Sequence, residues 1–406
     1  MRPRPYPVPF LATDETVPEA LARLRGIAPV VPVELPGSVV VWAVLSHEAV
    51  KEVLGNDNRV FGKDKKHWPA LHDGTIAEDW PLRTFLHGNH INTTDGTDHR
   101  RLRDYFGDAF SPRMVAALAE RVREIVTTLL DSAEAGGDEI DLVPAFTEQV
   151  PMRVICELYG VPESAHALLR QRATTVLSHT STPEAVHIAR SRLHEYLGDL
   201  VDQKRAEPGD DLTSALVHAR RGEDRLSHTE LVDLLCLTLL AGHETTAHAL
   251  ANSIVSLCTH RDQLALAARD GLWSKVVEES LRVSSPVQAN PFRFSLRETT
   301  VCGVDIPRGE ALLVCLGGAG TDPNQYGPTA GEFDITRQPS PHLSFAYGPH
   351  FCAGAPLARL EGRIALSGLF GRFPDLDLTV GAKDIPYRSN FVTYGPASVP
   401  ARLNRR

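Results

Sequence analysis

The sequence predicts a mostly α-helical protein with a small β part, arranged as one large domain over residues 1–406. Between residues 98 and 287, apolar side chains recur at the three-to-four spacing of buried helix faces. Short runs of strand-forming residues stand near the start of the chain and after Phe373. No Pro-, Gly- or Ser-rich linker separates these regions, so one domain is expected although the length suggests about two or three.

The first expected elements are a strand at Val39–Trp42 and a helix from His47 to Leu54. The segment Gly62–Thr97 follows and has weak periodicity. Long segments of this kind are usually either functional or disordered. Its aromatic residues, among them Trp68 and Trp80, favour the wall of a binding site.

Further helices are expected at Met114–Ala133, Leu142–Tyr159 and Pro183–Ala206, where apolar residues keep the helical spacing. Another helix is expected at about Pro356–Leu369, with proline near its start and Gly371 just past its end. The remainder of the chain is expected to form short strands and turns.

The charge balance argues against non-specific nucleic-acid binding. The chain carries 42 Lys and Arg against 51 Asp and Glu, a net charge of −9, whereas such binding needs a basic surface. The cysteines are too few and too widely spread for a disulfide scaffold, and no CxxC pair supports a zinc site. They are Cys156, Cys236, Cys258, Cys302, Cys315 and Cys352.

The most apolar long segment, Leu231–Leu250, contains Asp233, His243 and Glu244. It is therefore expected to be a buried helix rather than a membrane span. The start of the chain also lacks the apolar stretch of a signal peptide. We expect a cytoplasmic protein that binds neither nucleic acid nor membrane.

A long helix is expected to begin at Ser227–Glu230, whose Ser-His-Thr-Glu forms a capping box before about thirty mostly apolar residues, roughly 45 Å of helix. Its middle, Ala241–Thr246, reads Ala-Gly-His-Glu-Thr-Thr, in which glycine and two threonines disfavour a helix and a carboxylate needs a partner or a task. In one interpretation Thr245 bonds back to a preceding carbonyl and bends the helix. In the other, the helix opens at Gly242 to admit a small molecule, and Glu244 and Thr245 relay protons.

The most informative segment is Phe345–Gly354, Phe-Ala-Tyr-Gly-Pro-His-Phe-Cys-Ala-Gly, just before an expected helix. The partial positive charge of a helix N-terminus lowers the pKa of a thiol such as that of Cys352, and Gly348 and Gly354 would let backbone amides approach the sulfur. The thiolate could act as a nucleophile, a metal ligand or a haem ligand. No second cysteine is near, which argues against zinc or an iron–sulfur cluster, and the other cysteines are expected to be buried small hydrophobes.

These residues resemble the signature of the bacterial cytochromes P450, the haem-thiolate monooxygenases: Phe-x-x-Gly-x-(Arg/His)-x-Cys-x-Gly. The match falls on Phe345, Gly348, His350, Cys352 and Gly354. The resemblance extends from about residue 30 to residue 403. It implies the cytochrome P450 fold, a single triangular domain that encloses haem b, with Cys352 as the thiolate ligand of the iron and O2 as co-substrate.

Ala241–Thr246 is similar to the oxygen-binding motif of the same family. The resemblance implies that Ala241 and Gly242 border the haem. It also implies that Glu244 and Thr245 relay protons to the reacting oxygen.

Two further segments match the family in the expected order. Glu279–Arg282, Glu-Ser-Leu-Arg, is similar to the Glu-x-x-Arg motif, whose ends share one helix face; the resemblance implies a buried structural pair of Glu279 and Arg282. His99–Arg103, His-Arg-Arg-Leu-Arg, resembles a segment whose outer residues bind the haem propionates. The implied propionate set is His99, Arg103, Arg293 and His350.

The sequence departs from the family pattern in places that carry no ligand or relay residue. Ala346 stands where glycine is usual, and Ala353 where leucine is common. Gly96–Thr97 stands where two prolines are frequent, and Gly318–Thr321 where Ala-Asn-Arg is common. We expect these changes to tune the haem environment, with looser packing at Ala353.

The resemblance implies a substrate pocket above the haem, walled in part by Gly62–Thr94. The other expected lining residues are Leu240, Ala241, His243, Val287, Gln288, Ala289 and Phe391. They are mostly apolar, which suits a mid-sized apolar natural product. Lys65–Pro69 and Asp79–Leu82 resemble bacterial members that hydroxylate macrolides and steroids, so C–H hydroxylation of a macrolide, polyketide or steroid-like compound is expected.

Two alternative functions stay open. The first is an oxidative aryl-coupling enzyme that acts on a peptide or aromatic substrate; such enzymes often tolerate loss of the threonine, so the intact Glu244–Thr245 pair favours hydroxylation. The second is a non-catalytic haem-binding protein, which would need no proton relay.

Electrons are expected from a separate ferredoxin and ferredoxin reductase, because the haem domain accounts for all 406 residues. A basic patch of Arg101, Arg359 and Arg363 over Cys352 would attract an acidic ferredoxin. The alternative is that these are scattered, solvated arginines. We expect a monomer.

Overall fold

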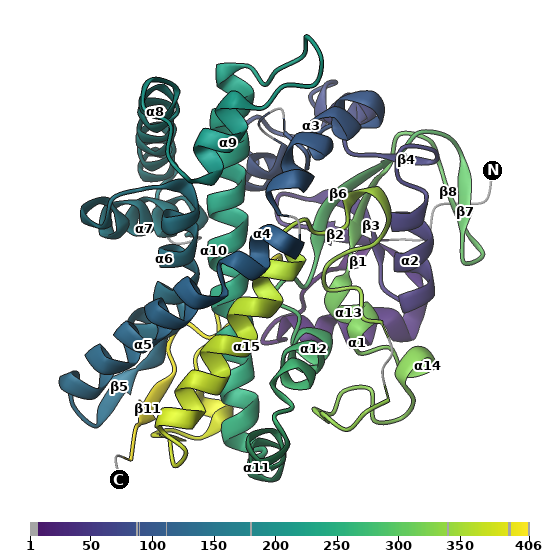
Figure 1. Ribbon diagram of the computed structural model, residues 1–406. Helices are drawn as coiled ribbons and strands as arrows, with labels where there is room; N and C mark the ends of the chain where they lie inside the picture. Colours follow the sequence, from purple (N-terminus) through teal and green to yellow (C-terminus); the bar gives the residue numbers. More distant parts are fainter. Residues whose placement is uncertain are drawn as a thin grey trace.

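The computed structural model describes residues 7–86, 88, 90–110, 112–178, 181–338, 341–388 and 391–404. It confirms a mostly helical protein with a small β part (Figure 1). The helices are α1 (Val17–Ile27), α2 (His47–Gly55), α3 (Gly96–Ala109), α4 (Pro112–Ala117), α5 (Ala119–Gly136), α6 (Gln149–Tyr159), α7 (Glu163–Leu177), α8 (Pro183–Ala206), α9 (Leu212–His218), α10 (His228–Thr259), α11 (Arg261–Asp270), α12 (Trp273–Val283), α13 (Leu316–Gly320), α14 (Pro323–Tyr326) and α15 (Ala355–Arg372).

The strands form one larger sheet and two small ones. They are β1 (Val8–Pro9), β2 (Val30–Leu35), β3 (Val39–Val44), β4 (Phe61–Gly62), β5 (Glu139–Asp141), β6 (Asn290–Ser295), β7 (Thr299–Val301), β8 (Val304–Ile306), β9 (Ala311–Val314), β10 (Asp377–Leu378) and β11 (Pro400–Arg402). The larger sheet has the order β1-β2-β3-β9-β6-β4. Its last pairing sets Gly62 opposite Phe294 and so brings the segment after β4 beside β6.

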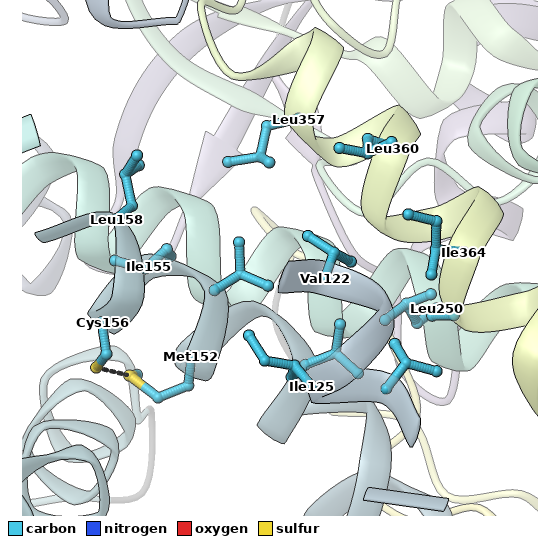
Figure 2. Close-up of a cluster of buried hydrophobic side chains, with 14 of the residues drawn as sticks. Val122, Ile125, Met152, Ile155, Cys156, Leu158, Leu250, Leu357, Leu360 and Ile364 are labelled. Atoms are coloured by element: carbon cyan, nitrogen blue, oxygen red, sulfur yellow. Dashed lines mark hydrogen bonds between the residues drawn. The ribbon is translucent and has the colours of Figure 1, made fainter. Parts of the chain in front are cut away.

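The long helix α10 runs through the middle of the molecule, with α15 in front of it and α6, α7 and α8 on one side (Figure 1). Its capping box is present, since the Ser227 hydroxyl accepts from the Glu230 amide and the Glu230 carboxylate accepts from the Ser227 amide. The main core packs around it. Figure 2 shows part of that core, where Val122 of α5, Ile155 of α6 and Ile364 of α15 point toward one another.

Two predicted helices differ from those observed. The predicted Met114–Ala133 helix is divided into α4 and α5. The predicted Leu142–Tyr159 helix begins as a π-helical turn, Val143–Thr147, and continues as α6. Pro144 lies in the first turn of this segment, where a missing N–H costs nothing, so the proline does not explain the π-helical turn.

The two tryptophans of Gly62–Thr97 are core residues, so the expectation that they form the wall of a binding site is wrong for them. Trp68 and Trp80 are 3% and 4% exposed. Both rings pack on Phe292 of β6, at centroid distances of 5.5 and 5.8 Å. Strand β6 presents aromatic side chains that sequence periodicity does not reveal. The tryptophan rings gain more by packing on this apolar surface than by lining a pocket.

Within the described residues, no helix combines the length and apolarity needed to cross a membrane.

Candidate functional site

Cys352 lies in a tight loop that leads directly into α15. The Cys352 amide donates to the Phe345 carbonyl at 2.9 Å, and the Phe351 amide donates to the Gly348 carbonyl at 3.0 Å. Gly348 has a φ of +73°, and a Cβ there would overlap the Leu54 carbonyl oxygen. Glycine at 348 is therefore required both by conformation and by the close approach of α2.

The backbone angles of Gly354 and Ala346 differ from what the sequence predicts. Gly354 has a φ of −78°, which any residue can adopt, so its conformation does not depend on glycine. Ala346 has a φ of +60°, in the left-handed region that glycine occupies without cost. The usual glycine of the signature therefore relieves strain that Ala346 retains.

We expect Gly348→Ala to lower the free energy of unfolding by about 2–4 kcal/mol, because the new Cβ adds both left-handed strain and a backbone clash. Ala346→Gly, two residues away, should change stability in the opposite direction, by up to about 1 kcal/mol. Denaturant unfolding followed by circular dichroism measures both. Equal, small effects of the two substitutions would contradict this account of the loop.

The Cys352 side chain is accessible, although protein atoms surround it densely. Burial raises the pKa of the Cys352 thiol, and this outweighs the opposing effects of the Gly354 amide, the Arg103 charge and the Ala355 amide. The amides at the start of α15 do approach the sulfur as expected. The expected fall in pKa is wrong for the thiol by itself, because desolvation disfavours a lone thiolate.

The middle of α10 borders open space at one point. Ala241 is exposed, although most neighbouring residues of this central helix are buried. The helix is unbroken from Ala241 to Thr246, so the expected opening at Gly242 is not observed. A Cβ at Gly242 would lie 3.0 Å from the Ile155 Cδ1 atom. Glycine here lets α6 pack closely against α10.

Thr245 bonds back to the helix, as one of the two interpretations predicted. Its hydroxyl donates to the Ala241 carbonyl at 2.6 Å. This bond uses the only hydroxyl proton and leaves the oxygen lone pairs available. Thr245 can therefore accept a proton in this conformation, and it must rotate to donate one elsewhere.

Glu244 is buried beside a small polar cavity of about 10 Å³, close to the size of one water molecule. Burial raises the pKa of Glu244 to about 7, against the effects of the Arg388 charge and of a hydrogen bond with Thr393. Arg388 also binds Glu148 at 2.6 Å. The cavity is lined by Glu148, Thr174, Leu177, His243, Glu244, Ala247, His248 and Arg388.

His243 lines this same cavity beside Glu244. Neither ring nitrogen has a hydrogen-bond partner among the described residues, and the side chain is 3% exposed. Burial, and then the charge of Arg170, lowers the pKa of His243 to about 4, so the ring is neutral at pH 7. The structure thus places His243 with the buried acid at the cavity.

Two buried histidines meet at a second polar site. The rings of His99 on α3 and His350 in the cysteine loop lie 4.0 Å apart between centroids. Both nitrogens of His99 and the Nε2 of His350 have no partner within the described part of the chain. Burial, and then the charge of Arg103, lowers the pKa of His99 to about 4. Unpartnered buried nitrogens of this kind call for a partner, such as a water molecule, an ion or a bound molecule.

Arg293, the remaining member of the predicted propionate set, has a protein partner. It is 1% exposed, and its Nε donates to Asp57 at 2.8 Å. Sequence reasoning missed Asp57, which precedes Arg293 by 236 positions in an ordinary turn. It also missed Lys63, a buried lysine whose charge acts on both His99 and His350.

Glu279 and Arg282 form the expected buried pair on α12. They lie 2.7 Å apart and are 7% and 2% exposed. Arg282 also donates to the carbonyls of Gly320 and Glu332, and its guanidinium lies over the Tyr326 ring. The arginine therefore fixes α12 to the chain between α13 and the cysteine loop.

Replacing Arg282 by Met should lower the free energy of unfolding by about 3–5 kcal/mol, since Glu279 would lose its main partner inside the protein. The double variant Glu279→Gln/Arg282→Met should recover part of this loss. Thermal and denaturant unfolding measure both. A loss below about 1 kcal/mol for the single variant would mean that the pair behaves like an exposed one.

The structure places the predicted substrate-contact residues unevenly. Leu240 and Val287 are partly exposed. Ala289 is fully buried, and Phe391 packs on Phe10 at a centroid distance of 5.2 Å. Gln288 is 2% exposed and donates to the Ser285 carbonyl at 2.8 Å. Gln288 thus holds its own turn together, and its place in the substrate pocket stays a prediction.

The predicted basic patch is largely neutralised. Arg101 binds Asp224 at 2.7 Å and Glu230 at 2.6 Å. Arg359 binds Glu278 at 2.7 Å. Of the three arginines, Arg363 alone is exposed without a carboxylate partner among the residues described. The interpretation as separate surface arginines fits better than a continuous patch.

Comparisons with known proteins agree on one family. The family model described as "Cytochrome P450" matches residues 272–393. The 2-hydroxy-5-methyl-1-naphthoate 7-hydroxylase of Streptomyces carzinostaticus is 38% identical over 95% of this chain and 94% of its own. The 6-deoxyerythronolide B hydroxylase of Saccharopolyspora erythraea is 37% identical over 94% of this chain and 95% of its own.

A solved structure gives the same result for the fold. "Testerone bound CYP154C4 from Streptomyces sp. ATCC 11861" superposes with a TM-score of 0.93 at 35% identity, covering 98% of each chain. The agreement extends over nearly the whole length, so it includes the sheet, α10 and the cysteine loop together.

Proposed function

The chain belongs to the cytochrome P450 family, and on that premise we propose that it hydroxylates a C–H bond of a mid-sized apolar natural product. The family carries haem iron and uses O2, so the enzyme is a haem monooxygenase. Its relatives act in secondary metabolism. The proposed substrate is a macrolide, another polyketide or a steroid-like compound, and the proposed unit is one haem domain over the 406 residues.

The residues present fit a haem. The accessible Cys352 thiol would ligate the iron, and the cations that already act on it, Arg103 and Arg359, would favour its thiolate. The unpartnered nitrogens of His99 and His350 would bind the propionates, together with Arg103 and Arg293. When bound, haem supplies the redox chemistry that activates O2.

Proton delivery is the task proposed for Glu244 and Thr245. Because the pKa of Glu244 is raised to about 7, its carboxyl can both hold and release a proton near neutral pH. Once it rotates away from the Ala241 carbonyl, the Thr245 hydroxyl would accept that proton on its lone pair and give its own proton toward the open space beside Ala241. Reprotonation of Glu244 would come through the cavity, whose Arg388–Glu148 ion pair lies beside it.

The observation that carries the proposal is the buried carboxyl of Glu244, whose pKa burial raises to about 7, one residue before the Thr245 hydroxyl in the middle of α10. A protein that only stores haem would have no use for an acid whose burial costs stability. The substrate class is supported by the relatives, which include a 2-hydroxy-5-methyl-1-naphthoate 7-hydroxylase and a 6-deoxyerythronolide B hydroxylase.

We propose a ferredoxin and its reductase as electron donors. Arg363 on α15 is exposed, has no carboxylate partner among the described residues, and could meet an acidic partner.

A library of polyketides, macrolides and steroids tests the proposal. Binding would be detected by the shift in haem spin state, followed by turnover with a surrogate ferredoxin and reductase. The expected result is a hydroxylated product from at least one compound that shifts the spin state. Coupled or dimeric products without hydroxylation would favour aryl coupling instead.

A further inference from the structure

The charges around the predicted propionate site do not balance within the protein. Arg293 is paired with Asp57 at 2.8 Å, and their side chains are 1% and 0% exposed. The pair is bonded through Nε, and Nη1 also donates to the Asn290 side-chain oxygen at 3.4 Å, which leaves Nη2 for another acceptor. Because Asp57 neutralises it at contact distance, Arg293 offers hydrogen bonds to a carboxylate but little net charge.

Lys63 lies against the same strand. The residue comes directly after β4, and its ammonium group donates to the Pro291 carbonyl of β6 at 3.2 Å. The residue is 8% exposed, and no carboxylate of the described chain comes within ion-pair distance of it. A buried ammonium with only a neutral partner is costly, and such a group normally has an anion beside it.

Asp95 holds the backbone of Lys63 in this place, but its carboxylate does not contact the Lys63 ammonium group. Its carboxylate accepts hydrogen bonds from the backbone amides of Lys63, at 2.7 Å, and of Asp64, at 2.9 Å. A Cβ at Gly62 would lie 2.8 Å from an Asp95 oxygen, so glycine is needed for this approach. Asp95 also immediately precedes α3. The same residue therefore sets Lys63 and the helix that carries His99 in one position.

Lys63 also acts electrostatically on the unpartnered His99 of α3. Its charge contributes to the lowered pKa of that histidine. Burial, and then the charge of Arg293, lowers the pKa of Lys63 itself well below its ordinary value. A cation in these surroundings gains most from an added carboxylate.

We propose that Lys63 binds a haem propionate. Together with Arg103 it supplies the positive charge that Arg293 does not provide, because Asp57 neutralises Arg293. Asp95 is the positioning residue of Lys63. The inference rests on the haem site proposed above and is independent of the substrate. Sequence motifs do not contain this lysine, because its role depends on the β4–β6 pairing.

The test uses the full-length holoprotein and measures two quantities: the rate of haem transfer to excess apomyoglobin, and the iron reduction potential. Lys63→Met should release haem at least ten times faster and shift the potential to more negative values, because a nearby positive charge is lost. Lys63→Arg should stay close to the parent protein. Lys65→Met is the matched control, since Lys65 is exposed two residues away, and it should change neither quantity.

A second variant keeps the test independent of folding. Asp57→Asn frees the charge of Arg293 while keeping an acceptor for it, so the potential should move to more positive values. Opposite potential shifts for Lys63→Met and Asp57→Asn support the proposal. Parent-like haem release and potential in Lys63→Met would overturn it, even if the holoprotein shows full monooxygenase activity. Absence of a thiolate spectrum in the parent protein would instead overturn the proposed function.

Discussion

Replacing Cys352 by Ala is expected to abolish the thiolate-ligated spectrum of the reduced, CO-bound protein and to reduce hydroxylation to background. The described residues around the site offer no second thiol, and histidine ligation would give a different spectrum. The measurement is the difference spectrum of the purified variant, reconstituted with haemin where necessary.

The other cysteines provide the control. Cys302→Ala removes a partly exposed thiol near Glu52, whose carboxylate lies 3.6 Å from the sulfur. Because Cys302 lies in the turn between β7 and β8, outside the cysteine loop, its loss should leave the spectrum unchanged. A retained thiolate spectrum in Cys352→Ala would show that another residue ligates the iron.

Glu244→Gln is expected to lower product formation about 100-fold or more, because glutamine cannot release a proton. It should also raise the free energy of unfolding at pH 8 by about 3 kcal/mol. Burial lifts the pKa of Glu244 to about 7 from an ordinary 4.5, so the folded state binds the proton more tightly than the unfolded chain. Stability is therefore lost as the pH rises between these values, and glutamine removes that loss.

Glu230→Gln is the matched control on the same helix. The pKa of Glu230 is lowered, because hydrogen bonds from Arg101 and the Ser227 amide outweigh the burial that acts against them. The sign is therefore reversed, and this variant should lower stability at pH 8 while turnover stays close to that of the parent. If Glu244→Gln keeps full product yield per electron, Glu244 does not relay protons. If it is less stable than the parent at pH 8, the buried acid is not the source of the pH dependence.

Features that depend on local sequence could be predicted. The capping box placed the start of α10, and the spacing of Phe345, Gly348 and Cys352 located the loop before α15. The i, i+3 spacing of Glu279 and Arg282 also located a real pair. In each case the interacting residues are close in the chain, so their pattern is visible in a short window.

Features that depend on distant pairing could not be predicted. Asp57 meets Arg293 only because β4 pairs with β6, and the same pairing determines where Lys63 lies. Trp68 was predicted to line a pocket but is covered by aromatic residues of β6. Arg101 was predicted to be free for a partner but is neutralised by Asp224 and Glu230. The charge of a single residue in the sequence does not show which carboxylate the fold brings to it.

We infer that the thiol of Cys352 and the acid of α10 together support insertion of one atom of O2 into a substrate. The most direct measurement is turnover of a compound selected by the spin-state screen under isotopically heavy O2, with mass analysis of the product. The expected result is one heavy oxygen atom in the product and the other in water, in proportion to the electrons consumed. A product whose new oxygen comes from water, or which contains no new oxygen, would contradict the claim.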